Sequence, residues 1–374
     1  MPKSEYTMLE VAGREVRLSN PGKVYFPKPG WTKLDLVEYY LAAADAVLVH
    51  LRERPTVMKR FVNGITEDPI WQKRVPKNIP DWLQTATVAF PSGRTAEELV
   101  ANDEAHLAWA VNLGVIDFNP HPVRRDDLDH PDELRVDLDP TPDVGWDEVR
   151  RTALVVNEVL RDHGLRGYPK TSGSKGIHVN VRIEPIHDYI EVRRAALALA
   201  REVERRAPDL ATSKWWKEER HGVFVDYNQN ARDRTVASCY SVRPTPDARV
   251  SCALAWDEVA DAEPGDFRID TVPARLQQTD PAADIDLEPG SLDGLLDLAR
   301  RDEEGGLGDA PWPPHFPKQR GEPPRVQPSR AKQRGRAGDP QPGGPPPGVS
   351  LGDSQRGFGS KPRTGQGYDA DWEQ

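Results

Sequence analysis

Two aspartates stand two residues apart in the stretch 134–141, and together they have the spacing to bind one divalent cation. Because side chains alternate along a β-strand, Asp137 and Asp139 would share one face, opposite Val136 and Leu138. Their Cα atoms would lie roughly 6.6 Å apart, so both carboxylates can lean towards the same hard ion. An Asp-x-Asp pair also recurs by chance, so the rest of the sequence must support this interpretation.

A third acidic residue, Asp226, stands in another apolar stretch, 222–230. Alternation places it on the face opposite Val223, Val225 and Tyr227. A surface aspartate would give the same pattern, but an acidic side chain within so apolar a strand usually has a partner. A metal ion would supply that partner.

The stretch 171–176 is rich in glycine and serine and carries a lysine near its tip. Such a turn lets backbone N–H groups approach a triphosphate closely. The candidate residues are Ser172, Gly173, Lys175 and Gly176. The pattern is not a Walker loop, and an ordinary turn with a solvated lysine would look the same. The strand that follows carries His178 in a row of polar side chains on one face, which favours a functional interpretation.

Helices and strands alternate along the part of the chain that carries these residues. The apolar periodicity predicts helices over 32–51, 95–114, 146–163 and 189–206, and strands over 115–118, 134–140, 177–183 and 223–227. Capping boxes are expected at Thr32 with Asp35 and at Thr95 with Glu98. A hairpin is expected around Gly13.

Basic and aromatic residues are interleaved in the loop-rich stretch 55–82. Lys59, Arg60 and Trp71 in this stretch could hold phosphates and stack on exposed bases. Half-buried aromatic rings under a charged surface would give the same composition, and both interpretations stay open. Lys23 and Lys33 flank the loop before the first helix, and spacing alone also fits ordinary solvated lysines.

Composition limits the fold and the location. Residues 301–374 contain 27 Pro or Gly among 74 residues without a period, which predicts a disordered tail after a folded domain over 1–300. The net charge of −10 argues against a protein that coats nucleic acid indiscriminately. Two cysteines without CxxC spacing predict no zinc site and a cytoplasmic location. Apolar runs are too short for a membrane-spanning helix, so no part at a membrane is expected.

Taken together, these patterns make the sequence resemble the polymerase domain of the bacterial end-joining ligase LigD, within the archaeo-eukaryotic primase superfamily. The resemblance covers about 18–298. It rests on the strings VDLDP (136–140), TSGSKGIHV (171–179), VFVDYNQN (223–230) and YSVR (240–243). No ligase or nuclease module accompanies these strings, so the expected form is the stand-alone actinobacterial one, such as the LigC-associated primase-polymerase.

The resemblance implies a mixed α/β fold, with an RRM-like catalytic sheet, a second α/β subdomain and an active-site groove between them. It implies that Asp137, Asp139 and Asp226 hold two divalent ions, manganese by family preference or magnesium. It implies nucleoside triphosphates as the substrate, held by Ser172, Lys175, His178 and Arg243. In one departure, the chain has Asn119-Pro120-His121 where relatives tend to have a histidine after the 115–118 strand, which puts that nucleotide contact in question.

The activity that the resemblance implies is template-dependent addition of nucleotides, preferably ribonucleotides, to primer 3′ ends. The expected sites are short gaps with a downstream 5′-phosphate, which Lys23 and Lys33 would bind, in excision repair or end joining. The expected partners are gapped or primer-template DNA, a DNA ligase and other repair proteins, at the nucleoid. Two alternatives remain: a metal-dependent phosphodiesterase or nuclease, and a non-catalytic module that binds DNA ends and recruits a ligase.

Overall fold

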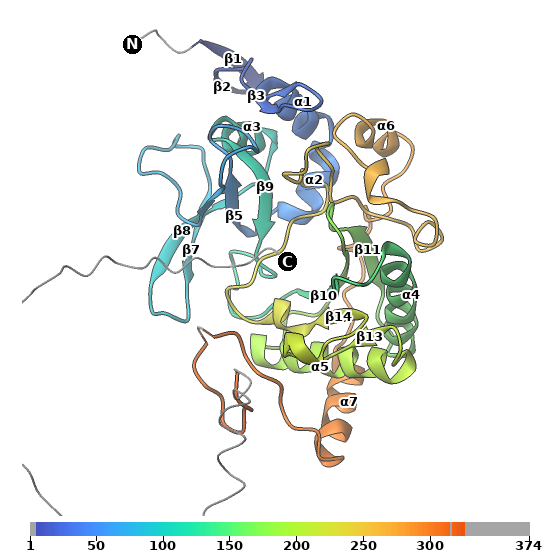
Figure 1. Ribbon diagram of the computed structural model, residues 1–374. Coiled ribbons are helices and arrows are strands. Elements are labelled where there is room, and N and C mark those ends of the chain that lie inside the picture. The colour runs from blue at the N-terminus through green and yellow to red at the C-terminus, as the bar shows by residue number, and fades with distance from the viewer. Residues whose placement is uncertain (1–4, 315, 326–374) are drawn as a thin grey trace, which may run out of the picture. The chain divides into compact units, whose positions relative to one another are not determined.

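The computed structural model describes residues 5–314 and 316–325, and Figure 1 shows their arrangement. Two five-stranded sheets make the framework, and two short hairpins precede them in the chain. Within the described residues, no helix is both long and apolar enough to cross a membrane.

The central sheet has its strands in the order β11-β12-β10-β14-β13. Its strands are β10 (Glu133–Pro140), β11 (Gly167–Thr171), β12 (Ile177–Arg182), β13 (Ala211–Thr212) and β14 (Val223–Asp226). Neighbouring strands are antiparallel, apart from the parallel pair β13 and β14. Helix α4 (Trp146–Asp162) follows β10 and helix α5 (Tyr189–Arg206) follows β12. This βαββαβ order is that of the RRM-like sheet that the resemblance implies.

The two faces of the central sheet differ in polarity because the side chains of its strands alternate. Val136 and Leu138 of β10 and Val179 of β12 are buried on the face that α4 and α5 cover. Asp137 and Asp139 point to the other face, and His178 stands directly opposite Asp137 on β12. The period of two that the sequence showed in β10 is therefore the period of the folded strand.

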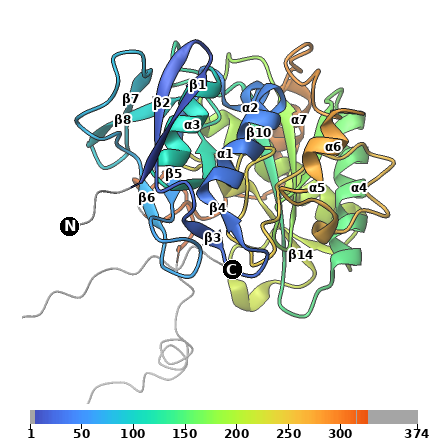
Figure 2. The same cartoon turned by 90° about the horizontal axis from the view of Figure 1, so that it is seen from above.

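The second sheet is formed by β5 (Pro55–Arg60), β6 (Ile70–Gln72), β7 (Thr85–Ala89), β8 (Thr95–Val100) and β9 (Val115–Pro120). The two hairpins are β1 (Tyr6–Val11) with β2 (Arg14–Ser19), as predicted around Gly13, and β3 (Val24–Phe26) with β4 (Trp31–Thr32). Figure 2 shows β7 and β8 on the side away from α4. Short connections include α6 (Val272–Leu276) and the 3-10 turns η1 (Lys217–Glu219), η2 (Tyr227–Asn230) and η3 (Pro264–Asp266).

Three of the predicted helices are present with small changes. The helix expected over 32–51 is two helices, α1 (Lys33–Ala42) and α2 (Ala44–Leu51), and the predicted capping box of Thr32 and Asp35 is formed. The helices expected over 146–163 and 189–206 are α4 and α5. Long, strongly periodic segments were therefore predictable from the sequence.

The helix expected over 95–114 is wrong in its first half. Residues Thr95–Val100 form β8, which pairs with β7, and only Glu104–Asn112 form helix α3. The side chain of Asp103, and not that of Thr95, caps the helix by accepting from the backbone N–H groups of Ala105 and His106. The hairpin of β7 and β8 satisfies the backbone of 95–100, which local capping signals cannot reveal.

The domain boundary predicted at residue 300 is also wrong. Helix α7 (Asp293–Glu304) passes it, and the described residues up to Arg325 belong to the same compact unit. We call residues 305–314 and 316–325 the C-terminal strap. Its Trp312 is only 2% exposed. One buried aromatic side chain can anchor a segment whose average composition predicts disorder. The predicted disorder of the remaining tail, 326–374, lies outside the described residues.

This correction changes what a truncation should do. A chain cut after Arg300 is expected to lose at least about 3 kcal/mol of unfolding free energy relative to one cut after Gln327, because buried Arg193 loses its acceptors in the strap. Urea denaturation followed by circular dichroism measures the difference. Equal unfolding midpoints and slopes for the two truncations would contradict the expectation.

Candidate active site

Three carboxylates meet on the polar face of the central sheet. The antiparallel register places Asp137 of β10 directly opposite Asp226 at the end of β14, and Asp139 lies two residues further along β10. One carboxylate oxygen from each of the three residues lies within 4.8 Å of the others. Residues 89 positions apart in the sequence therefore form one acidic cluster.

Burial and mutual repulsion change the proton affinities in this cluster. Burial and the neighbouring Asp137 and Asp226 raise the pKa of Asp139 to about 9. Burial and Asp137 also raise the pKa of Asp226. Burial alone would raise the pKa of Asp137 as well, but His178 and Lys170 lower it below its ordinary value. Without a cation the cluster therefore holds on to protons, and a bound cation would displace them by stabilising the ionised carboxylates.

The donor set fits a hard divalent cation. Its three side chains offer only carboxylate oxygens, which magnesium and manganese prefer. Oδ1 of Asp137 is buried and, within the described part of the chain, accepts no hydrogen bond, although Nε2 of His178 lies 3.2 Å from it. A bound ion would satisfy this oxygen.

His178 is fixed on its other side by Lys170 of β11. The ammonium of Lys170 donates to Nδ1 of His178 over 2.8 Å, to the carbonyl oxygen of Ala237 and to the hydroxyl of Ser251. Burial lowers the pKa of Lys170 to about 8, and burial and Lys170 lower the pKa of His178. A neutral His178 that accepts at Nδ1 carries its proton on Nε2, facing Asp137. The sequence analysis missed Lys170, although it lies directly opposite His178 in the sheet.

The Gly-Ser loop joins the end of β11 to β12 beside the acidic cluster. The hydroxyl of Ser172 accepts from the backbone N–H groups of Ser174 and Gly176, which keeps the loop compact. A Cβ at Gly176 would lie 2.5 Å from the carbonyl oxygen of Leu138, so only glycine lets the loop approach β10 this closely. Lys175 is exposed at the tip. The structure therefore brings Ser172, Gly176 and Lys175 next to the strand of Asp137 and Asp139.

Arg243 links the Gly-Ser loop to the second sheet. Its Nη1 donates to Oδ2 of Asp117 on β9 over 2.5 Å, and the side chain of Arg243 lies where a Cβ on Gly173 would have to stand. Gly173 also has a φ of +70°, which favours glycine. The loop and Arg243 thus form one side of the site.

Asn119 at the end of β9 and His121 just after it stand where relatives tend to have a histidine that contacts the nucleotide, and both side chains are buried. Asn119 is buried and its side-chain amide donates to the carbonyl oxygen of Asp117 over 3.3 Å. His121 is buried against Glu98, with 3.0 Å between Nε2 and a carboxylate oxygen. That this departure affects the nucleotide contact stays a prediction.

The predicted DNA contacts fall into two groups. Lys23, Lys33 and Arg60 form a cationic group near β3 and α1. Burial, and then the positive charges of Lys23 and Arg60, lower the pKa of Lys33 to about 8. Lys59 leaves β5 on the other side and its ammonium lies 4.8 Å from the ring of Trp71, which is 49% exposed. One continuous surface is therefore not formed by all five residues.

Lys33 is not the solvated lysine that spacing alone allowed. It is 4% exposed, and its ammonium donates to the carbonyl oxygens of Ser19 over 2.8 Å and Asn112 over 2.9 Å. The more accessible Lys23 donates to the carbonyl oxygen of Val62 and to the side chain of Asn63, each over 2.7 Å. Lys33 thus has a structural role that its sequence context did not indicate.

Comparisons with known proteins show which family and which proteins this chain resembles. The profile of the family described as LigD, primase-polymerase domain, matches residues 32–282. The multifunctional non-homologous end joining protein LigD of Mycolicibacterium smegmatis is 32% identical over 310 residues, which are 81% of this chain and 40% of that protein. The protein of the same name from Pseudomonas aeruginosa is 31% identical over 275 residues, 72% of this chain and 32% of that protein. The chain thus spans less than half the length of these relatives.

One solved structure is similar over nearly all of its length. The polymerase domain from Mycobacterium tuberculosis ligase D, in complex with DNA, shares 31% sequence identity with a TM-score of 0.69. The match covers 73% of this chain and 99% of that one. The mixed α/β fold predicted from the sequence is confirmed.

Proposed function

Because this chain belongs to the LigD primase-polymerase domain family, we propose that it is a nucleotidyltransferase that extends primer 3′ ends on a DNA template during repair. The observation that carries the proposal is the cluster of Asp137, Asp139 and Asp226 beside the Gly-Ser loop. The cluster can hold cations, and the loop can hold the phosphates of an incoming nucleotide.

The residues of the site divide the work. Asp137, Asp139 and Asp226 would hold two divalent ions, either Mn²⁺ or Mg²⁺. When bound, such ions lower the pKa of a primer 3′-OH and stabilise the charge of an in-line displacement of pyrophosphate. His178 and Lys170 lower the pKa of Asp137 and so favour its ionised form. Backbone N–H groups of the loop, together with Lys175 and Arg243, would bind the triphosphate through charge-assisted hydrogen bonds.

A preference for ribonucleotides is part of the proposal and rests on family resemblance alone. We expect faster extension of a primer on gapped DNA with ribonucleoside than with deoxyribonucleoside triphosphates, and faster with Mn²⁺ than with Mg²⁺. Single-turnover primer extension with each nucleotide and metal measures both. Equal or better use of deoxyribonucleotides would contradict the preference. Release of nucleotides without any added triphosphate would favour a nuclease instead.

The cationic group of Lys23, Lys33 and Arg60 supports binding of a downstream 5′-phosphate. These side chains donate to carbonyl and amide oxygens, for example Arg60 to the carbonyl oxygen of Leu113 over 2.7 Å. Among the described residues these acceptors are neutral, so they do not cancel the positive charge. A 5′-phosphate carries more negative charge than an internal phosphodiester and would compensate it better.

We therefore expect the protein to fill short gaps with a 5′-phosphate faster, and to bind them more tightly, than gaps with a 5′-hydroxyl. Losing one charge-assisted contact costs roughly 1.5–3 kcal/mol, so Lys23→Ala should remove about a ten- to a hundredfold difference in affinity. Fluorescence anisotropy with the two gapped duplexes measures it. Lys33→Ala should act in the same direction, but it also removes a buried ammonium and needs a parallel stability measurement.

Lys28→Ala is the matched control, since Lys28 is exposed in the turn between β3 and β4. It should keep the preference for the 5′-phosphate. If wild-type protein binds both gap ends equally, the cationic group does not read the 5′ end. The proposed role of this chain in gap filling would then lose its support. The proposal that a DNA ligase seals the product at the nucleoid would lose its support as well.

A further inference from the structure

We propose that the C-terminal strap is a positioning element for the metal site: through Arg193 and Asn228 it holds Asp226 in the orientation that binds the cation. The inference rests on the proposed metal site of Asp137, Asp139 and Asp226. The strap lies beyond residues 32–282, which the family profile matches.

Arg193 is the point where the strap meets the body of the protein. It lies on α5 and is only 1% exposed. Its guanidinium donates to the side chain of Asp309 over 2.8 Å and to the carbonyl oxygens of Ala310 and Pro311 over 2.9 and 3.1 Å. Its Nε donates to Oδ1 of Asn228 over 2.7 Å. One buried cation therefore binds the strap and the turn η2 together.

Asn228 carries this contact to the third aspartate. Its side-chain amide donates to the carbonyl oxygen of Pro311 over 3.1 Å, and its backbone N–H donates to Oδ1 of Asp226 over 2.8 Å. Gln229 of the same turn donates to the other oxygen, Oδ2, over 3.2 Å. The orientation of the Asp226 carboxylate is thus set by η2. At Asn228 η2 is held by Arg193 and the strap, and at Asn230 it is held by the backbone of Arg135 on β10.

The strap has an internal structure that lets it act as a unit. The ring of Trp312 lies 4.0 Å from the guanidinium carbon of Arg193, and its indole N–H donates to Asp309 over 2.8 Å. The carboxylate of Glu322 accepts from the backbone N–H groups of Trp312 and Gln319. Arg325 pairs with Glu322 over 2.6 Å and donates to the carbonyl oxygens of nearby residues of the strap. These contacts close the strap on itself.

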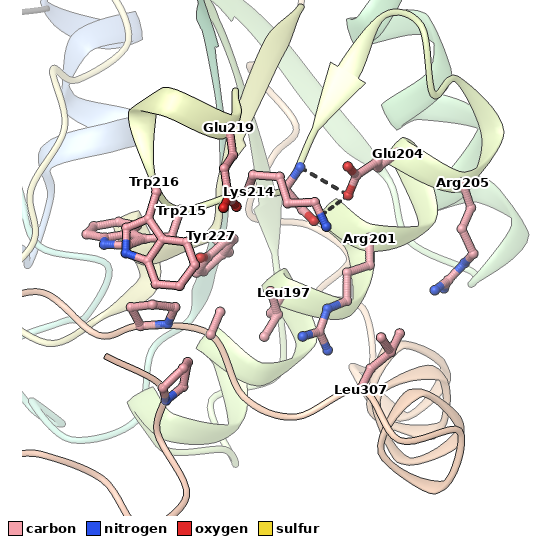
Figure 3. Close-up of a pocket in the computed structure, with 14 residues that line it drawn as sticks. Leu197, Arg201, Glu204, Arg205, Lys214, Trp215, Trp216, Glu219, Tyr227 and Leu307 are labelled. Atoms are coloured by element: carbon pink, nitrogen blue, oxygen red, sulfur yellow. Dashed lines mark hydrogen bonds between the residues drawn. The ribbon is translucent and has the colours of Figure 1, made fainter. Parts of the chain in front are cut away.

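Next to this anchor the strap is separated from the body by open space. A pocket of about 460 Å³ lies here. Figure 3 shows it between Leu307 of the strap, Leu197 and Arg201 of α5, and the neighbouring Trp215 and Trp216. A continuous apolar interface is therefore lacking on this side among the described residues. The strap also accepts from Arg201 at Gly308 and from the indole N–H of Trp215 at Arg325. The contacts around Arg193 are those that join the strap to η2, so removing them should loosen the strap next to η2 and leave the central sheet folded.

The test uses two substitutions in the full-length chain, Asp309→Ala in the strap and Asn228→Ala in η2. Asn228→Ala keeps the backbone N–H that Asp226 accepts from, so it removes only the link to Arg193 and the strap. Partners that orient a metal ligand typically contribute ten- to a hundredfold to affinity. We expect each variant to weaken Mn²⁺ binding roughly tenfold, measured directly by electron paramagnetic resonance, and to lower kcat without changing the KM for primer.

The double variant should bind Mn²⁺ about as weakly as either single one, because both act through the same chain of contacts. Arg194→Ala is the matched control. Arg194 neighbours Arg193 on α5 but makes its ion pair with Glu303, over 2.6 Å, on α7. It should leave Mn²⁺ affinity unchanged. Circular dichroism confirms folding of each variant, and Asp309→Asn replaces Asp309→Ala if the latter does not fold.

Folded variants with wild-type Mn²⁺ affinity and kcat would overturn the inference and reduce the strap to a stabilising segment. If wild-type protein and Asp137→Ala bind Mn²⁺ equally, the metal site itself is wrong and the inference falls with it. The Asp137→Ala comparison thus separates failure of the proposed metal site from failure of the strap as its positioning element.

Discussion

Replacing Asp137 or Asp139 by alanine is expected to abolish nucleotide addition while DNA affinity stays within roughly twofold of wild type. The two carboxylates stand on one face of β10, and each offers an oxygen within 4.8 Å of one from Asp226. Either substitution therefore removes one cation ligand and one negative charge from the acidic cluster. A loss of at least about 4 kcal/mol of transition-state stabilisation corresponds to roughly a thousandfold in rate. DNA affinity depends mainly on lysine and arginine contacts to phosphates, which these substitutions leave intact.

Single-turnover primer extension and fluorescence anisotropy on the same gapped duplex measure the two quantities. Asp143→Ala is the matched control, because Asp143 is an exposed aspartate in the loop just after β10. It should keep full activity. Extension by Asp137→Ala or Asp139→Ala at a rate close to that of the control would end the assignment of the acidic cluster as the catalytic centre.

The second large effect concerns stability without metal, where Asp139→Asn is expected to make the protein more stable at pH 8. The unfolded carboxyl ionises near 3.8 and the folded one at about 9. Between these pH values the unfolded chain binds fewer protons than the folded one, so the free energy of unfolding falls as pH rises. The raised pKa of Asp226 acts in the same direction. Asparagine removes the titration of residue 139, with an expected gain of about 2–4 kcal/mol.

Urea denaturation in EDTA at several pH values between 5 and 9, roughly the window of this titration, measures the gain. Wild-type stability should fall with pH more steeply than that of Asp139→Asn, and Asp143→Asn should follow wild type. Added Mn²⁺ should stabilise the wild type by mass action and do less for Asp139→Asn. A variant no more stable than wild type in EDTA would show that the cluster carries no stored repulsion.

The sequence predicted the acidic cluster because alternation within one strand is a local property. Asp137 and Asp139 share a face wherever β10 is placed, and the string around Asp226 belongs to the same family pattern. Contacts between neighbouring strands are not local in sequence. Lys170, which contacts His178 from the neighbouring strand, was therefore missed.

Errors arose where a tertiary contact prevails over a local signal. Thr95 and Glu98 have the spacing of a capping box, but Glu98 is buried against His121 and its segment pairs with β7. The average composition of residues 301–374 predicts disorder and does not reveal that Trp312 is buried. The ring of Trp312 packs against the guanidinium of Arg193 on α5. Lys33 looked like a surface residue because nothing in its own helix shows that Ser19 and Asn112 accept from it.

The separation of the aspartates along the chain has a consequence for biosynthesis. Asp137 and Asp139 leave the ribosome well before Asp226, which pairs with Asp137 only when β14 joins β10. Pairing of strands so far apart in sequence is slow, because a long loop must close first. A nascent chain therefore carries an incomplete cation site until synthesis has passed β14. The strap, which emerges later still, is the last described segment that can dock, so the site acquires its final support only after residue 325 has left the ribosome.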